Sequence, residues 1–93
     1  MIKSFKCGET RLIFERQGSR RLPGEIQKVA LRKLVAIHAA LQTDDLRIPP
    51  GNRIEALKGK RKGQHCIRIN DQWRICFRFE NGDAYEVEIA DYH

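Results

Sequence analysis

The last three residues join a carboxylate, a phenol and an imidazole in consecutive positions, Asp91, Tyr92 and His93. An imidazole titrates near neutral pH, so His93 could donate or accept a proton, and Asp91 could accept one or orient the ring. Tyr92 could stack on a nucleobase or donate its hydroxyl. A terminal histidine is more often an exposed residue without a role. Here a strand-like run at 85–89 directly precedes it, so a sheet could hold these groups in place.

Two positively charged features accompany this tail. The segment 58–62 reads Lys-Gly-Lys-Arg-Lys and could bind phosphates through side chains and backbone N–H groups, although a solvated charged turn is the commoner outcome. Arg68, Arg74 and Arg78 alternate with apolar residues, which predicts that they share the sheet face away from the helices. Because Arg binds phosphate with a planar fork, Arg74 is the functional candidate. We expect Arg78 to pair with Glu86.

These residue types suit RNA cleavage without a metal. RNA carries its own nucleophile, the 2′-hydroxyl, so a protein needs only a base, an acid and cations for the phosphorane charge. His65 is a weaker alternative proton carrier, and His38 is expected at the surface or its boundary. The histidines lack metal-ligand spacing and the glycines form no nucleotide-binding motif. We therefore expect no metal and no cofactor.

Length and charge limit the remaining possibilities. The 93 residues predict one domain, 1–93, and the net charge of +6 favours partners such as nucleic acid, acidic proteins or membrane surfaces, with good solubility as the bland alternative. No apolar run approaches the roughly 20 residues of a membrane span, and no secretory signal opens the chain, so we expect a cytoplasmic protein. Cys7, Cys66 and Cys76 are odd in number without a CxxC pair, which argues against disulfides and zinc. Cys66 and Cys76 are expected to be small buried residues.

The elements are predicted from periodicity. An edge strand at 1–5 and a short helix at 9–16 precede an amphipathic helix at 25–41, with Lys28, Arg32 and Lys33 on its other sides. A loop at 43–52 leads to period-two runs at 65–70, 73–80 and 85–90. The expected fold is α+β, with two N-terminal helices packed on one face of a small twisted, mainly antiparallel sheet.

The last hairpin allows a prediction of register. A two-residue turn at 81–82 would place apolar residues opposite polar ones, whereas a three-residue loop at 81–83 matches the patterns, and a bulge could do the same. The three-residue loop pairs Phe77 with Val87, and Arg74 with Ala90. Either way, Arg74 is expected next to the tail at 91–93.

Three segments together resemble the HigB family, which belongs to the RelE-like toxins of bacterial toxin–antitoxin pairs. They are Leu57-Lys58-Gly59, the run 67–75 with the sequence IRINDQWRI, and Asp91-Tyr92-His93, and the similarity covers nearly the whole chain. The resemblance implies a RelE-like fold and a ribosome-dependent endoribonuclease that cuts mRNA in the 30S A site. The expected product is a 2′,3′-cyclic phosphate, formed without metal.

The resemblance also implies roles for individual residues. Lys58 and Arg74 would stabilise charge, Tyr92 would position or stack on the base, and Asp91 and His93 would transfer protons, with acid and base unassigned. Other residues are expected to contact the RNA: Lys60, Arg61, Lys62, Arg68 and Trp73. Many relatives have Asp where this chain has Lys60, which adds positive charge, and Ser is frequent at the position of Cys66.

The implied partner is a HigA-type helix-turn-helix antitoxin, and the pair would bind operator DNA, which the toxin contacts only within that complex. A second hypothesis is a non-catalytic basic module that acts with such an antitoxin as a DNA-bound co-repressor. It predicts salt-dependent binding without cleavage and tolerance of substitution at His93.

Overall fold

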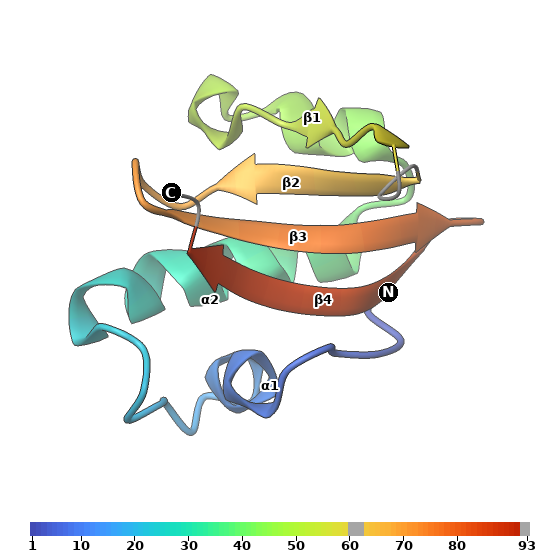
Figure 1. Cartoon of the computed structure of the whole chain (residues 1–93). Helices are drawn as coiled ribbons and strands as arrows, with labels where there is room; N and C mark the ends of the chain where they lie inside the picture. The colour runs from blue at the N-terminus through green and yellow to red at the C-terminus, as the bar shows by residue number, and fades with distance from the viewer. Residues whose placement is uncertain (60–62, 92–93) are drawn as a thin grey trace.

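The computed structural model describes residues 1–59 and 63–91. Its strands form one antiparallel sheet in the order β1-β2-β3-β4, with the bounds β1 Glu55–Ala56, β2 Gln64–Arg68, β3 Trp73–Glu80 and β4 Asp83–Asp91. The helices α1 (Gly8–Phe14) and α2 (Gly24–Ala39) precede the sheet, and two 3₁₀ turns, η1 (Thr43–Arg47) and η2 (Pro50–Asn52), lead into it. In Figure 1, α2 lies behind the sheet and α1 lies below, beside β4. The predicted α+β architecture is confirmed.

Helix α2 supplies the centre of the core. Its residues Ile26, Ala30, Leu34 and Ile37 recur at three- and four-residue intervals and are fully or almost fully buried. They pack against apolar residues of all three long strands, which include Ile67, Ile75, Phe77 and Val87. The helix ends at Ala39, two residues earlier than predicted, and leaves Leu41 exposed.

The N-terminal segment follows the outer edge of β4 without forming a continuous strand. Isolated parallel bridges join Ile2 to Ala84 and Phe5 to Val87. Backbone hydrogen bonds from Lys3 N to Ala84 O (2.8 Å) and from Lys6 N to Val87 O (3.0 Å) hold it there. The predicted edge strand is therefore replaced by two short contacts that cover the edge of the sheet.

The hairpin between β3 and β4 corrects the predicted three-residue loop. A two-residue turn at 81–82 connects the strands, and Phe79 pairs with Ala84. A bulge between Cys76 and Arg78 then shifts the pairing by one residue, with Glu86 at a φ of 53°. Beyond the bulge the register is the predicted one, because Ile75 pairs with Ile89 and Arg74 with Ala90. The bulge reconciles a favourable Asn-Gly turn with an apolar inner face.

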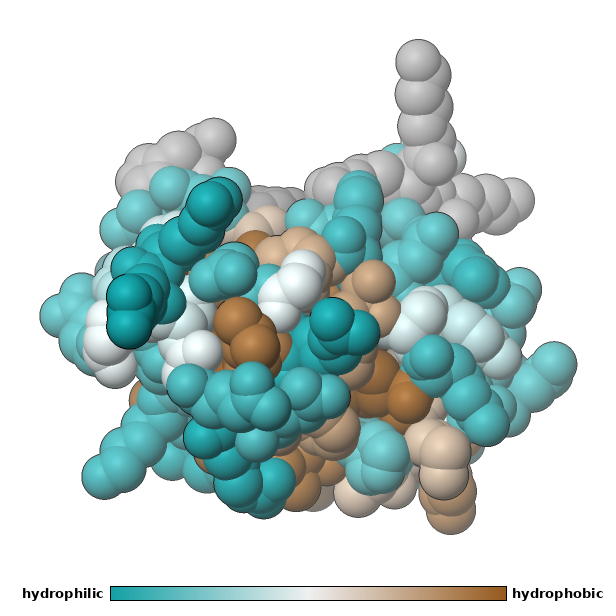
Figure 2. Space-filling view, turned by 90° about the horizontal axis from the view of Figure 1, so that it is seen from below, coloured by the Kyte–Doolittle hydropathy of each residue, from teal (hydrophilic) through white to brown (hydrophobic). Residues whose placement is uncertain are grey.

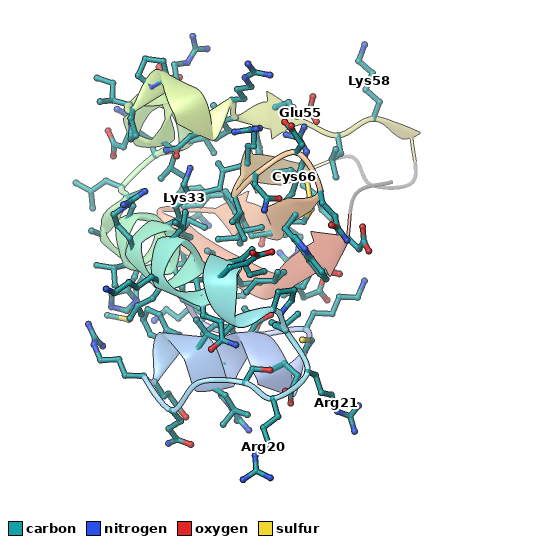
Figure 3. All side chains as sticks on the ribbon, turned by 90° about the vertical axis from the view of Figure 1, so that its left-hand side faces the viewer. Arg20, Arg21, Lys33, Glu55, Lys58 and Cys66 are labelled. Atoms are coloured by element: carbon teal, nitrogen blue, oxygen red, sulfur yellow. A yellow bond between two sulfur atoms is a disulfide. The ribbon has the colours of Figure 1, made fainter. Side chains whose placement is uncertain are left out.

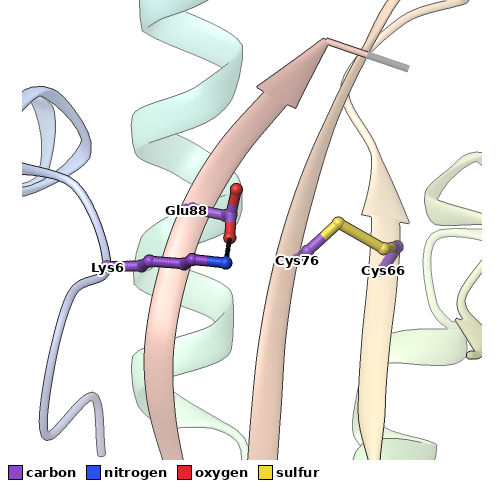
Figure 4. Close-up of a disulfide and its surroundings, with 4 residues drawn as sticks. All are labelled: Lys6, Cys66, Cys76 and Glu88. Atoms are coloured by element: carbon purple, nitrogen blue, oxygen red, sulfur yellow. Dashed lines mark ion pairs between the residues drawn. A yellow bond between two sulfur atoms is a disulfide. The ribbon is translucent and has the colours of Figure 1, made fainter. Parts of the chain in front are cut away.

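A disulfide links Cys66 of β2 to Cys76 of β3, so the expectation that these cysteines are unpaired was wrong. The two residues face each other across the strands with their Cα atoms 4.2 Å apart, as residues do at a non-hydrogen-bonded antiparallel pair. Figure 4 shows the bond beside the ion pair between Lys6 Nζ and the Glu88 carboxylate (3.1 Å). Both cysteines are buried, as expected, and Cys7 is free. Sequence spacing missed the disulfide because strand register alone brings the sulfurs together.

Candidate functional site

Strands β2 and β3 place the three candidate arginines on one face of the sheet, which we call the outer face because α2 covers the other. The outer face of these two strands is made by Gln64, Cys66, Arg68, Arg74, Cys76 and Arg78. Arg68 lies directly opposite Arg74, and Arg74 lies directly opposite Ala90 of β4. The predicted pairing of Arg74 with Ala90 is therefore confirmed, and of the predicted tail only Asp91 belongs to the described residues.

The turn between β2 and β3 shapes this end of the sheet. Asn70 Oδ1 accepts hydrogen bonds from the backbone N–H groups of Gln72 (2.9 Å) and Trp73 (2.7 Å), which closes the turn with a side chain. Gln72 Nε2 donates to Asp91 Oδ2 at 3.2 Å. Asp91, the first residue of the tail, is thus tied to the turn that precedes Arg74.

Positive charge gathers around this turn. The Arg68 guanidinium donates a hydrogen bond to Asp71, and this bond and the charge of Arg68 lower the pKa of the Asp71 carboxyl below its usual value. Arg53 and Arg74 lower the same pKa further through their charges. Arg68 thus pairs with the exposed Asp71 carboxylate, and Arg53 and Arg74 lie near enough to form an arginine cluster with Arg68 whose charges act on it.

Two members of this site, Arg53 and Gln72, were missed by sequence reasoning. Arg53 is held at the end of η2 in a left-handed conformation (φ 45°) as the chain turns into β1. That backbone geometry leaves no side-chain pattern in the sequence. Gln72 could have been suspected, because it directly precedes the strand that carries Arg74.

Lys58 lies toward the other end of the strands. It follows Leu57, whose N–H donates to Gln64 O (2.8 Å), and Gln64 pairs with Arg78. Four β3 residues separate that level from Arg74, which is about 14 Å along a strand. In Figure 3, Lys58 extends away from the sheet beside the end of β1. The structure brings Arg68 and Arg74 together, with Asp91 one residue beyond the strand partner of Arg74, and it places Lys58 toward the other end of β3.

The other predicted site residues divide into two groups. Trp73 pairs with Asp91 in the sheet, and its half-buried ring packs against the core. The remaining predictions, for Lys60, Arg61, Lys62, Tyr92 and His93, lie outside the described residues. Arg78 keeps its predicted structural role with different partners, because it forms an ion pair with Glu80 (2.6 Å) and its guanidinium lies 4.6 Å from the centre of the Tyr85 ring.

Both described histidines, His38 and His65, contact neighbouring residues of the fold. His65 lies on the inner side of β2, and its ring stacks on the Phe77 ring with the two ring centres 6.2 Å apart. Burial lowers the pKa of His65. Its neighbours along β2, Gln64 and Cys66, are on the outer face with Arg68, so His65 points away from the arginine cluster. His38 Nδ1 accepts a hydrogen bond from Ile2 N (3.1 Å).

Two classes of feature are missing from the part of the chain that the structure describes. Residues 1–59 and 63–91 contain no group of three or more His, Cys, Asp or Glu side chains that could hold a metal ion. No helix in these ranges is long and apolar enough to cross a lipid bilayer.

Comparison with known proteins identifies relatives over the whole chain. Residues 3–93 match the model of the RelE-like toxin HigB of type II toxin–antitoxin systems. The chain is 37% identical to Endoribonuclease HigB of Proteus vulgaris over 93 residues, which cover 100% of both proteins. It is 46% identical to Toxin HigB-1 of Vibrio cholerae over 70 residues, which cover 75% of this chain and 74% of that protein.

Solved structures with little sequence identity share the fold. A point mutant of YafQ from E. coli superimposes with a TM-score of 0.59 at 14% identity, covering 98% of this chain and 91% of that chain. A YoeB/ParE toxin from Agrobacterium tumefaciens gives a TM-score of 0.58 at 13% identity, covering 99% and 98%. With the family match over residues 3–93, these findings show that the chain belongs to the HigB family of RelE-like toxins of type II toxin–antitoxin systems.

Proposed function

We propose that this chain is a ribosome-dependent endoribonuclease that cuts mRNA in the 30S A site without a metal. Membership of the HigB family and the name of the Proteus vulgaris relative support the activity. One observation supports its location: Arg68 and Arg74 lie side by side on the outer face, and Asp91 directly follows Ala90, the strand partner of Arg74. Two guanidinium groups suit a reaction that builds charge on phosphate, and a carboxylate one residue beyond the strand partner of Arg74 suits proton transfer.

The proposed reaction needs only groups from the chain and the RNA. A base takes the proton of the 2′-hydroxyl, the 2′-oxygen attacks the adjacent phosphorus, and the 5′-oxygen leaves after receiving a proton from an acid. The products are a 2′,3′-cyclic phosphate and a 5′-hydroxyl. Asp91 and His93 are the proton-transfer candidates, Arg74 and Arg68 stabilise the phosphorane, and Tyr92 positions the base.

Binding of the RNA extends beyond the reacting phosphate. Lys58 binds a phosphate farther along the RNA, because its level in the sheet lies about 14 Å along β3 from Arg74. Lys60, Arg61 and Lys62 add sequence-independent attraction, and Trp73 lies beside Asp91 in the sheet. The proposed partners are a HigA-type helix-turn-helix antitoxin, operator DNA within that complex, and the ribosome in the cytoplasm.

The test is cleavage of mRNA on programmed ribosomes by the wild type, Arg74→Ala and Arg78→Ala. Arg78 is a matched control because it lies on the same face with its own partners, Glu80 and Tyr85. We expect Arg74→Ala to lower the single-turnover rate by about 10²–10³-fold and Arg78→Ala to change it less than about threefold. Cleavage should persist in EDTA-treated enzyme on washed ribosomes, and the product should carry a 2′,3′-cyclic phosphate.

Two results would contradict the proposal. Equal losses of cleavage rate in Arg74→Ala and Arg78→Ala would show that the rate depends on the total positive charge of the sheet and not on the position of Arg74. No cleavage by folded wild-type protein would favour the non-catalytic co-repressor, which binds DNA only with its antitoxin.

A further inference from the structure

Lys33 is buried in the core, although the helical pattern predicts it on an exposed side of α2. Lys33 is only 8% exposed. Its ammonium donates hydrogen bonds to Asn52 Oδ1 at 2.7 Å and to the backbone oxygen of Arg68 at 2.6 Å. Figure 3 shows Lys33 projecting from α2 into the interior of the molecule. This side chain therefore connects three elements, α2, η2 and the end of β2.

A buried ammonium is costly unless it is well bound. Burial lowers the pKa of Lys33, and the charges of Arg32 and Arg68 lower it further. Within the described residues, no carboxylate forms an ion pair with Lys33. Both acceptors of Lys33 are neutral oxygens. These hydrogen bonds therefore fix the position of the ammonium group without neutralising its positive charge.

The acceptors of Lys33 determine what that geometry fixes. Asn52 is itself buried and donates through Nδ2 to Leu46 O at 3.1 Å, so it is held on both sides. The other acceptor belongs to Arg68, the last residue of β2, whose side chain lies opposite Arg74 on the outer face. The Lys33 ammonium thus restrains the Arg68 backbone from the inner side of the sheet. On the outer side at the same position, the positive charges of Arg68 and Arg74 face each other.

Opposed like charges across strands repel and favour separation of the two residues. Asp71 offsets part of this repulsion, but it is exposed and lies on the turn. The backbone restraint at Arg68 acts from the core, where packing density is high and displacement is small. Without it, we expect the end of β2 to relax and the two guanidinium groups to move apart.

We propose that Lys33 is a positioning residue of the endoribonuclease site, which holds the Arg68 backbone so that the Arg68 and Arg74 side chains stay side by side for the reacting phosphate. This inference rests on the proposed function. Lys33 does not touch the RNA, because it acts from the opposite side of the sheet through Arg68.

The test compares Lys33→Met with Arg32→Met in the ribosome cleavage assay. Arg32 is the neighbouring residue on the same helix and is exposed, so its replacement removes the same charge without touching the core. We expect Lys33→Met to lower kcat by about tenfold to a hundredfold with a small change in KM, as misplacement of a catalytic group does. Arg32→Met should retain kcat within about twofold. Equal losses in both variants would overturn the proposal.

A double-mutant cycle separates positioning from general destabilisation. Under conditions where circular dichroism shows all proteins folded, Lys33→Met should cost little additional activity when Arg68 is already Ala. Additive losses in Lys33→Met/Arg68→Ala would mean that Lys33 does not act through Arg68, and would overturn the inference. If Lys33→Met does not fold, Lys33→Gln replaces it in the same cycle, and a wild-type kcat for that variant would also overturn it.

The same assay distinguishes this inference from the function on which it rests. Failure of the wild type to cleave would remove the proposed function. Cleavage by the wild type that is lost in Arg74→Ala but unchanged in a folded Lys33 variant would remove only the positioning role.

Discussion

At the scale of single residues, the candidate site combines opposed arginines with one exposed carboxylate. Arg68 and Arg74 face each other across β2 and β3, and the Arg68 guanidinium binds Asp71, whose side chain is 97% exposed. An RNA phosphate would compete with Asp71 for the same guanidinium. The carboxylate therefore sets how strongly the site attracts an anion.

Replacing that carboxylate should strengthen RNA binding. Asp71→Asn removes a negative charge and releases the Arg68 fork from an exposed, solvent-screened ion pair, so the gain is modest. We expect single-stranded RNA to bind about two- to fivefold more tightly, measured by fluorescence anisotropy at fixed salt. Asp44→Asn is the matched control, because it removes an exposed Asp paired with Arg47 at 3.0 Å. Equal tightening in both variants would show only an effect of net charge.

His65 should make the protein sensitive to acid. Burial lowers its pKa in the folded state below the usual 6.5, so the unfolded chain binds the proton first as pH falls. The free energy of unfolding should therefore decrease as the pH falls below 6.5 and toward the folded-state pKa. The urea midpoint at about pH 5.5 should be lower than at about pH 7.5, and the difference should shrink in His65→Phe. An undiminished difference in that variant would assign the effect to other groups.

At the scale of elements, the β-bulge in the last hairpin decides what lies beside Arg74. Glu86 adopts a φ of 53° there, and its N–H donates to Ser4 Oγ at 2.9 Å. A left-handed conformation disfavours any residue with a Cβ atom. The bulge thus carries local strain, while it permits the register that places Arg74 opposite Ala90.

This strain predicts opposite effects of two substitutions. Glu86→Gly should raise the free energy of unfolding by about 1 kcal/mol, because glycine adopts positive φ without a steric penalty. Glu86→Val should lower it, because a β-branched side chain tolerates that conformation poorly. Urea denaturation measures both, and the same sign of change in the two variants would contradict the assignment of strain to position 86.

The disulfide joins the central strands on the outer face, between the Arg68–Arg74 pair and the Gln64–Arg78 pair. Its ten-residue separation constrains the unfolded chain, and a loop of that size is worth about 2–3 kcal/mol. Dithiothreitol should lower the urea midpoint of the wild type accordingly, and it should leave Cys66→Ser unaffected. Cys7→Ser is the control, because Cys7 is the free thiol, and it should respond as the wild type does. A wild-type midpoint that is insensitive to reductant would contradict this contribution.

At the scale of the whole molecule, the candidate site does not lie in the segment with the largest excess of positive charge. The helical segment 8–39 has seven Lys or Arg and three Glu residues, whereas the strand segment 64–91 has three Arg and six Asp or Glu residues. Figure 2, which views the molecule from below, shows a mostly hydrophilic face with hydrophobic residues visible between hydrophilic ones. Arg68 and Arg74 are thus a local concentration of positive charge within the more acidic of these two segments.

The N-terminal segment closes one side of the sheet. Residues 1–6 bond to Ala84 and Val87 and so cover backbone groups of β4 that would otherwise be open to another strand. Deletion of residues 1–6 should therefore lower stability and promote self-association, which light scattering during size-exclusion chromatography would detect. Ser4→Ala, which removes only one side-chain hydrogen bond, should remain at the wild-type mass. A deletion variant with unchanged stability and mass would contradict a role for this segment.

Local patterns in the sequence predict the elements but not their long-range contacts. Helix α2 and the three long strands follow from periods of 3.6 and 2, and the shared face of Arg68, Arg74 and Arg78 follows from alternation. The family motifs predicted the fold class correctly. The same reasoning placed Lys33 at the surface, because a polar residue is normally solvated.

Local patterns along the chain were enough to predict the α+β order, the amphipathic helix, the arginine face and the family, because neighbouring residues carry these signals. Three features could be seen only in the folded chain: the hydrogen bond from Lys33 to the Arg68 carbonyl, the disulfide between Cys66 and Cys76, and the bulge that sets the register of Arg74. Each of these depends on segments far apart in sequence, and only packing and hydrogen bonding in the folded chain bring them together. The distance between Lys58 and the arginine cluster has the same origin, because strand register spaces them along the sheet.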